Sequence, residues 1–387
     1  MNTKGDLSIK VATIKTQMQH YRSLPEYLLD GVGASLSVLV RPRVKRKPFL
    51  PEDTLHTNQN GLPSYWFSGL IIAGITLLIG RLVSLILNET WTDRDWVIST
   101  WVACVGALAL IANKINIRTF LDTFHEFLLE KILVLADLED FELWLDKNFK
   151  IFWPLVGGLI GGPILALILI SNLILIDSRM PSIGTMVVIV LACIQSIWVA
   201  YYLFPFYISL PSQLARYRFD LYTTDPSSSE VVGRLSRLMT FIMYVTLAFI
   251  VQLTLGLNRL EVFNLSTAFI FSLLVWAPTI VLYVAGQYHI SNVITRAKWN
   301  TLNVIQTKIE MLNATALDKE NGAPDKTLLE AIEKLMDSHD RIKATPNSAL
   351  NFRAGLNFMN SLLLPILAFL FANLEGVIQS IENLLRK

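Results

Sequence analysis

Six apolar segments constrain this chain more than any other feature, because a helix needs roughly 20 apolar residues to cross a bilayer. They are Trp66 to Leu87, Trp96 to Ala112, Ile151 to Ile176, Gly184 to Leu210, Leu238 to Leu257 and Ser266 to Tyr288. The 387 residues are 53% hydrophobic and 17% charged, which is more apolar and less charged than a soluble domain. The sequence therefore predicts an all-α, polytopic helical membrane protein with six to seven transmembrane helices and cytoplasmic helical extensions.

The connections between these segments alternate in length and charge. The loops after the first, third and fifth segments are short, and each holds one arginine: Arg94, Arg179 and Arg259. The connections on the other side are longer and carry more Lys and Arg, which marks the cytoplasmic side. We therefore expect a multi-pass plasma-membrane protein with a cytoplasmic N-terminus. The absence of a recognisable targeting signal fits a prokaryotic inner membrane, and a net charge of +2 argues against a nucleic-acid partner.

The first domain, residues 1–65, precedes all spans. It contains a short helical stretch around Leu24 to Leu39, followed by a basic run at the membrane surface: Arg41, Arg43, Lys45, Arg46 and Lys47. One interpretation is attraction to anionic headgroups, worth roughly 1 kcal/mol per charge. The other is a plain topology signal, which is the interpretation we favour here.

The second domain, residues 66–288, holds the six spans in three hairpins. Between the second and third spans, residues 120–149 are helix-competent throughout, with eight acids and a broad apolar face. Eight carboxylates would be repelled by anionic lipid headgroups. We therefore expect this helix to pack beneath the bundle rather than along the membrane. In the next connection, Ser227 and Glu230 have the spacing of a capping box, which predicts that the fifth helix begins in the cytosol.

The third domain, residues 289–345, is predicted to be a cytoplasmic helical hairpin. Two apolar stripes step by three and four residues: Leu302, Ile305, Ile309 and Leu312, and then Leu328, Ile332, Leu335, His339 and Ile342. Gly322 and Pro324 lie between them and favour a turn. Nothing in the pattern except Pro278 interrupts the sixth span before the first stripe, so one helix is expected to run from Ser266 to Leu312 and to couple membrane and cytosol.

The last domain, residues 346–387, contains a terminal apolar helix at 354–374 and a tail. A seventh span is the favoured interpretation, and a re-entrant or interfacial helix is the alternative. Asn357, Asn360 and Ser361 share one face of this helix, and polar groups at membrane depth are expected to face protein or water. They are candidates for a pore lining or a packing face. Gln195, Gln252 and Gln287 each interrupt a span and are secondary candidates for a polar pathway.

Two further intramembrane features have competing interpretations. Arg81 is a charge within the first span, and it serves either as an anchor that reaches the interface or as a functional charge. Four glycines, Gly157, Gly158, Gly161 and Gly162, form overlapping small-xxx-small repeats in the third span. Such repeats allow close helix packing in lipid, which we favour over a flexible gate at Pro163.

No catalytic constellation is found in the sequence. No nucleotide-binding loop, metalloprotease motif or nucleophile elbow occurs, and the five histidines are scattered. Both cysteines lie in apolar runs and are read as buried, inert thiols. We therefore expect no enzyme activity, no catalytic or metal site and no cofactor, although a membrane enzyme remains as a third interpretation after the two that follow.

The leading hypothesis is an oligomeric membrane channel or pore. Its cytoplasmic hairpin would assemble a homo-oligomer by coiled-coil contacts, and its terminal helix would line or close the conduit. The alternative is a non-conducting sensor or scaffold subunit whose cytoplasmic helices bind a protein partner. The layout of paired spans, cytoplasmic helices and a polar last span resembles that of oligomeric helical channels such as insect chemoreceptors. That resemblance covers topology alone, because the aromatic-glutamine pattern of that family's last helix is absent here.

Overall fold

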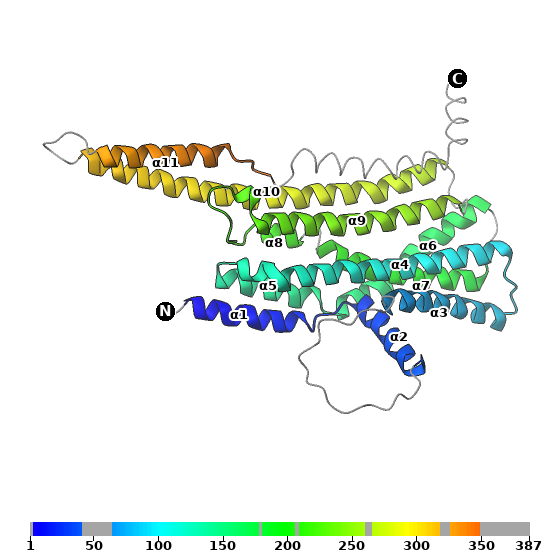
Figure 1. The fold of residues 1–387 in the computed structure, drawn as a ribbon. Helices are drawn as coiled ribbons and strands as arrows, with labels where there is room; N and C mark the ends of the chain where they lie inside the picture. The colour runs from blue at the N-terminus through cyan, green and yellow to red at the C-terminus, as the bar shows by residue number, and fades with distance from the viewer. Residues whose placement is uncertain are drawn as a thin grey trace, which may run out of the picture.

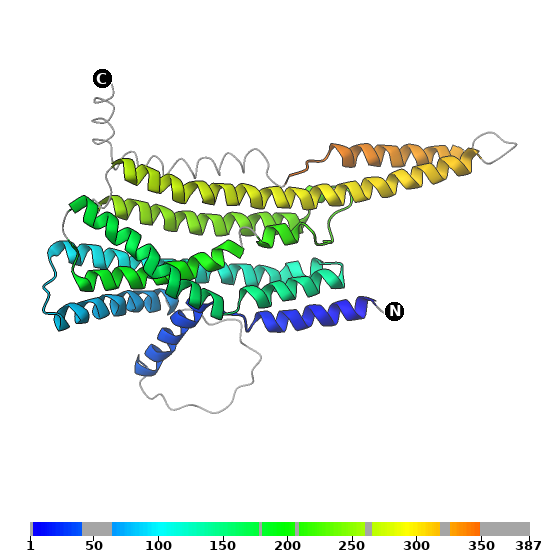
Figure 2. The ribbon, with the colours of Figure 1, turned by 180° about the vertical axis from the view of Figure 1, so that it is seen from behind.

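The computed structural model describes residues 3–40, 64–177, 180–205, 209–259, 265–317 and 326–348. This part of the chain is helical, and its only β-type pairing is an isolated bridge between Ile132 and Phe219. Most of the helices lie along one long direction, as Figures 1 and 2 show from opposite sides. The all-helical class predicted from the sequence is confirmed for the described residues.

Five described helices are long and apolar enough to cross a membrane. They are α3 (Ser64–Ile86), α4 (Asp93–Thr123), α6 (Phe152–Asp177), α7 (Ile183–Phe204) and α9 (Glu230–Arg259). The sixth predicted segment falls in α10 (Leu265–Leu317), and the predicted terminal helix at 354–374 lies outside the described residues. A multi-pass helical membrane protein is therefore supported, while the count of six to seven spans goes beyond these five helices.

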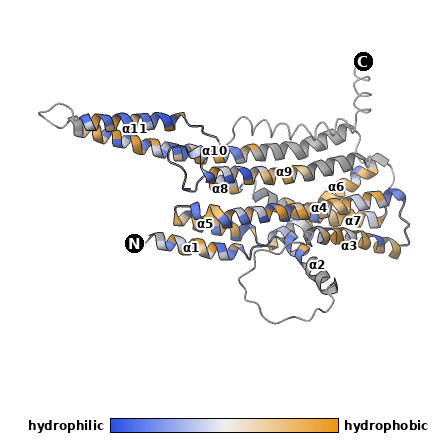
Figure 3. Cartoon of the chain, in the orientation of Figure 1, coloured by the Kyte–Doolittle hydropathy of each residue, from blue (hydrophilic) through white to orange (hydrophobic). Residues whose placement is uncertain are grey.

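Helices α4 and α7 form the centre of this bundle. Helix α7 packs against α3, α4 and α6, while α4 packs against α3, α7 and α9. Of the most apolar stretch of each helix, 56% is buried in α4 but only 28% in α3 and in α6. Helices α3 and α6 therefore present apolar side chains outward, as lipid-facing helices do. Figure 3 shows more hydrophilic residues on α1, α5 and α11 than on these two helices.

Further helices lie at one end of the bundle, which we call the hairpin end. It contains α1 (Thr3–Met18), α2 (Leu24–Val40), α5 (Leu135–Asn148), α8 (Leu210–Leu214) and α11 (Lys326–Ala344) (Figure 1). The opposite end, where a short turn joins α3 to α4, we call the loop end. A large core at the hairpin end combines side chains of α1, α4, α5, α9 and α10.

The hairpin-end core is built around aromatic rings. Phe124 stacks on Phe141 with ring centroids 4.9 Å apart, and Phe141 stacks on Trp144 at 6.1 Å. The Tyr217 hydroxyl donates to Asp140 Oδ2 at 2.9 Å. Burial, together with this hydrogen bond, raises the pKa of Tyr217 well above its ordinary value, so its hydroxyl stays protonated and keeps donating. A rigid aromatic core thus joins the connections that leave the bundle.

The sequence prediction for residues 120–149 was wrong in one respect. Helix α4 continues through a π-turn at Phe124–Leu128 and a 3₁₀ turn at Leu129–Lys131. The helical conformation ends there, and the next helix, α5, begins at Leu135. In the break, Leu133 N donates to the Arg218 carbonyl and Asp220 N donates to the Lys131 carbonyl, both at 2.8 Å. Because Ile132 and Val134 are β-branched, they suit this extended conformation, and the chain reverses there into α5.

Two other boundaries also differ from expectation. The second span was predicted to end at Ala112, but α4 continues to Thr123. The capping box predicted from Ser227 and Glu230 is absent. The Ser227 hydroxyl donates instead to Asp225 Oδ1 at 2.6 Å, which lowers the pKa of Asp225, and α9 begins at Glu230 after a 3₁₀ turn. Helix α1 was not predicted at all.

The long continuous helix that was expected to follow from the sixth apolar segment is confirmed. Helix α10 runs without interruption from Leu265 to Leu317, and α11 packs beside its far half. In Figure 1 this pair projects beyond the rest of the molecule. Lys298, which is buried, donates to the Thr345 carbonyl at 2.7 Å and to Asn347 Oδ1 at 2.9 Å. These bonds tie the chain after α11 back to α10.

Candidate functional site: a polar row along α4

Buried polar side chains follow α4 through the apolar bundle. Ser99, Asn113 and Asn116 are 0%, 1% and 2% exposed. From Ser99 to Asn116 the helix rises roughly 25 Å, which is close to the thickness of a hydrocarbon core of about 30 Å. Ser99 and Asn113 lie two heptads apart, with Gly106 halfway between, so all three share one face of the helix. We call these positions, with the α7 and α3 side chains that meet them, the polar row.

At the loop end, the row begins with a saturated carboxylate. Asp95 forms a capping box with Thr92, and its Oδ1 accepts hydrogen bonds from Ser182 N at 3.2 Å and from the Thr185 hydroxyl at 2.9 Å. Thr185 in turn lies 3.2 Å from the Ser99 hydroxyl. Because each oxygen of Asp95 accepts two hydrogen bonds, this group fastens the start of α7 to α4 rather than offering a free charge.

In the middle of the row, an amide from α7 enters. Gln195 Nε2 donates to the Thr76 hydroxyl of α3 at 3.4 Å. Its other end lies against Gly106, where an added Cβ would come within 2.4 Å of Gln195 Oε1. Glycine at position 106 therefore leaves room for the Gln195 amide in its present position, and a larger residue would require that amide to move. Among the described residues, Gln195 Oε1 has no hydrogen-bond partner.

Toward the hairpin end, the row holds amide groups that the protein does not satisfy. Neither Nδ2 nor Oδ1 of Asn113 has a hydrogen-bond partner in the described part of the chain, and Asn116 Oδ1 also has none. A buried polar group without a partner costs about 1–3 kcal/mol. Where such groups persist at membrane depth, they usually face protein or a water-filled cavity. These amides are therefore buried groups for which an additional hydrogen-bond partner is expected.

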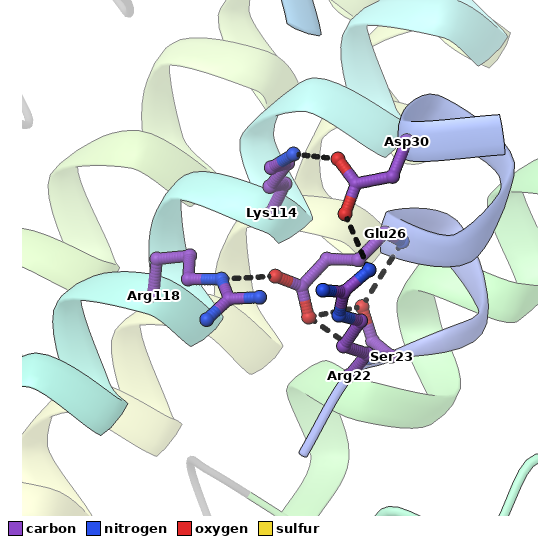
Figure 4. A network of polar contacts seen from close by, with 6 residues as sticks. All are labelled: Arg22, Ser23, Glu26, Asp30, Lys114 and Arg118. Atoms are coloured by element: carbon purple, nitrogen blue, oxygen red, sulfur yellow. Dashed lines mark hydrogen bonds and ion pairs between the residues drawn. The ribbon is translucent and has the colours of Figure 1, made fainter. Parts of the chain in front are cut away.

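The hairpin end of the row is closed by a charged cluster, shown in Figure 4. Glu26 of α2 is fully buried, and its Oε1 accepts a hydrogen bond from Arg118 Nε at 2.5 Å. Its Oε2 accepts from Ser23 N at 2.8 Å and from the Ser23 hydroxyl at 3.2 Å. The Ser23 hydroxyl also accepts from Glu26 N, so the same carboxylate caps α2 and pairs with α4.

A second ion pair in the cluster lies one turn along α2. Lys114 Nζ donates to Asp30 Oδ1 at 2.5 Å, and Arg22 lies 3.4 Å from Asp30 Oδ2. Lys114 and Arg118 are four residues apart on α4, so two cations of α4 face two carboxylates of α2 (Figure 4). The Tyr202 hydroxyl of α7 accepts from Leu24 N at 3.0 Å. Helix α2 is thereby fixed across the ends of both α4 and α7.

The residues singled out in the sequence are distributed around this row. Gln195 is part of it, whereas Gln287 lies on α10, where it is buried and its Nε2 has no partner among the described residues. Arg81 lies at the loop end of α3, with its guanidinium carbon 5.7 Å from the Trp91 ring and 5.8 Å from the Trp96 ring. Such cation–π contacts suit an anchored charge at an interface.

The glycine repeat of α6 faces α7 at three of its four positions, and at two of them a Cβ would be too close to α7. An added Cβ on Gly158 would come within 2.0 Å of the Trp198 indole nitrogen, and one on Gly162 within 2.8 Å of the Ile194 backbone. Gly161 would make ordinary contacts, and Gly157 would meet nothing within 4 Å. Two glycines thus permit the close approach of α6 and α7, which is the packing interpretation of the repeat.

Several predicted residues lie where the structure gives no side-chain description. Asn357, Asn360 and Ser361 are outside the described residues, as is the basic run Arg41, Arg43, Lys45, Arg46 and Lys47. Gln252 lies in α9, but its side chain is not described. Among the described residues, no group of three His, Cys, Asp or Glu side chains is arranged to hold a metal ion.

Sequence reasoning missed Asn113, Asn116 and the Glu26 cluster. The two asparagines were assigned to a connection because hydropathy falls at Ala112, although nothing in the sequence stops the helix there. The Glu26 cap had a readable signal, since Ser23 and Glu26 have capping-box spacing with Pro25 in the first turn of α2. What the sequence did not reveal is that the same carboxylate would also meet Arg118.

Comparison with known proteins adds no relative. No protein-family model, no curated protein and no solved structure matches this chain.

Proposed function

We propose that this protein is an oligomeric channel or pore of the plasma membrane, with its N-terminus and the α10–α11 hairpin in the cytoplasm. The observation that carries the proposal is the group of unpartnered amides at Asn113, Asn116 and Gln195, buried within helices of membrane-spanning length. A wetted conduit gives those amides hydrogen-bond partners, whereas a dry bundle leaves them unpaired.

The polar row has the extent that a conduit requires. It joins the Asp95 cluster at the loop end to the Glu26 cluster at the hairpin end, and its middle is lined by neutral amide and hydroxyl groups. Neutral donors and acceptors can replace the hydration shell of a permeating species without trapping it. Helix α2, held by two ion pairs, lies across the hairpin end and is placed to control access there.

Homo-oligomerisation and the terminal helix remain part of the proposal. The terminal helix, with Asn357, Asn360 and Ser361, is a second candidate lining at an interface between subunits. In this account the α10–α11 hairpin supplies the assembly surface. Although α10 and α11 pack against each other, five large apolar side chains of the pair stay exposed: Trp299, Val304, Met311, Leu329 and Met336.

The same exposed side chains favour the second candidate function, a non-conducting sensor or scaffold subunit. In that account the hairpin binds a cytoplasmic protein, and the spans serve as an anchor. The two accounts differ at Asn113. A channel wets this side chain, while an anchor gains nothing from an unpartnered amide at that depth.

The test is conductance across a planar bilayer containing the purified full-length protein. We expect discrete current steps from the intact chain and a conductance reduced at least about tenfold by Asn113→Leu, because leucine removes the wetted amide and fills its space. Asn360→Leu and a truncation before Ala354 report on the terminal helix. Loss of current in those two variants but not in Asn113→Leu would assign the conduit to the subunit interface.

The matched control is Asn172→Leu, which makes the same change on α6, where the amide donates to the Ile168 carbonyl of its own helix outside the row. This variant should conduct like the intact chain. A silent bilayer with folded, oligomeric protein would contradict the channel proposal and favour the scaffold.

A further inference from the structure

A pocket of about 210 Å³ lies at the hairpin end, between the connector that follows α8 and residues 293–301 of α10. Its apolar walls are formed by Leu133, Phe219, Leu221, Val293 and Ala297. The polar side chains that line it are Tyr217, Arg218, Tyr222, Thr223, Arg296, Asn300 and Thr301. Apolar walls with a few converging polar groups are typical of small-molecule sites.

Two arginines give this pocket its charge. Among the described residues, its lining contains Arg218 and Arg296 but no acidic side chain. Neither guanidinium forms an ion pair with a carboxylate of the described residues. Arg296 makes one long hydrogen bond, from Nη1 to the Arg216 carbonyl at 3.4 Å, which leaves most of its donors available. An anion is therefore the ligand charge that the pocket favours.

The remaining polar side chains restrict how a ligand is held. The Tyr217 hydroxyl is already committed to Asp140, and the Thr301 hydroxyl donates to the Ala297 carbonyl. Asn300 and the half-exposed Tyr222 ring complete the wall beside Arg296. The pocket volume is below the roughly 300 Å³ at which pockets for drug-sized ligands begin. A ligand that fits is therefore one ring or one short chain that bears the anionic group.

The wall opposite α10 is rigid. The Arg218 carbonyl and Asp220 N form the two 2.8 Å backbone hydrogen bonds to the break after α4, and Arg218 N donates to Asp137 Oδ2 at 2.8 Å. Arg218 is thus held on the aromatic core of the hairpin end, whereas Arg296 belongs to α10. A ligand that bridges the two arginines would add a polar contact between α10 and the connector, beside the apolar contacts that α10 already makes with that core.

We propose that this pocket binds a small amphipathic anion, a phosphate or carboxylate joined to one apolar ring or short chain, between Arg218 and Arg296. The anion is either a soluble compound or the headgroup region of an anionic lipid, because α10 leaves the predicted membrane only about 12 Å before Arg296. The inference is independent of the channel proposal.

The test uses phenyl phosphate as the probe, measured by calorimetry against the full-length protein in nanodiscs of neutral lipid. We expect saturable binding that is at least about tenfold tighter than that of benzyl alcohol, which has the ring without the charge. Arg218→Gln and Arg296→Gln should each weaken phenyl phosphate binding at least about tenfold. Arg296→Lys, which keeps the charge, should weaken it less than Arg296→Gln.

The matched control is Arg341→Gln on α11, an exposed arginine outside the pocket, which should bind the probe like the intact chain. Nanodiscs of anionic phosphatidylglycerol separate the two sources: weaker probe binding there assigns the site to lipid, and unchanged binding assigns it to a soluble anion. Equal affinity for phenyl phosphate and benzyl alcohol, or equal binding by the intact chain and Arg296→Gln, would overturn the proposal.

Discussion

At the residue scale, Glu26 makes two interactions that usually belong to different side chains. It caps α2 and pairs with Arg118 of α4, and it does so while fully buried at the end of the polar row. A buried carboxylate is tolerated only when its hydrogen bonds are satisfied, and here three donors satisfy it. Removing it leaves the Arg118 guanidinium, one third exposed, without its carboxylate.

Glu26→Ala should therefore reduce the free energy of unfolding by about 3 kcal/mol, at the lower end of the range for a broken buried pair, because Arg118 is partly solvated. The unfolding temperature in detergent measures the effect. Glu139→Ala makes the same substitution on the exposed face of α5, where the side chain has no ion-pair partner among the described residues, and should change stability by less than about 0.5 kcal/mol. Equal melting temperatures for the two variants would show that the cluster does not hold α2 in place.

At the scale of elements, the sequence predicted five long apolar helices, α2 and the continuity of α10, because each depends on local properties. Runs of apolar residues identify membrane helices, and the uninterrupted pattern after the sixth segment predicted the 53-residue helix. Helix α1 was missed because its three buried side chains, Val11, Ile14 and Met18, form a weak stripe among polar residues. Its contacts with α5 exist only in the folded chain.

The seam between α10 and α11 offers a matched pair of positions on one helix. Leu302 is 2% exposed and belongs to the predicted stripe, whereas Val304, two residues later, is 56% exposed. Leu302→Ala should lower the free energy of unfolding by about 2–4 kcal/mol, since it opens a cavity in the seam. Val304→Ala should lower it by less than about 1 kcal/mol. Chemical denaturation followed by circular dichroism compares them, and a larger loss for Val304→Ala would place the main packing surface on the other face of α10.

At the scale of the whole molecule, the polar row is a product of packing between distant segments. Its contacts join Ser99 to Thr185 and Gln195 to Thr76, so they unite three helices that the sequence presents one at a time. The sequence marked Gln195 as an interruption, but it could not reveal that Gly106 makes room for this amide. Asn113 and Asn116 belong to the row only because α4 continues to Thr123. Hydropathy alone ended the helix at Ala112, before both asparagines.

The most direct test of the channel account is whether water reaches Asn113 in the folded protein. In a background without native thiols, made by Cys104→Ser and Cys193→Ala, Asn113→Cys is compared with Ala109→Cys, which lies one turn earlier in an apolar cluster. A charged, membrane-impermeant thiosulfonate is added to proteoliposomes, and the modified fraction is read by mass spectrometry. The account predicts modification of Asn113→Cys and none of Ala109→Cys. Equal protection of both thiols would contradict it, because the row would then be dry.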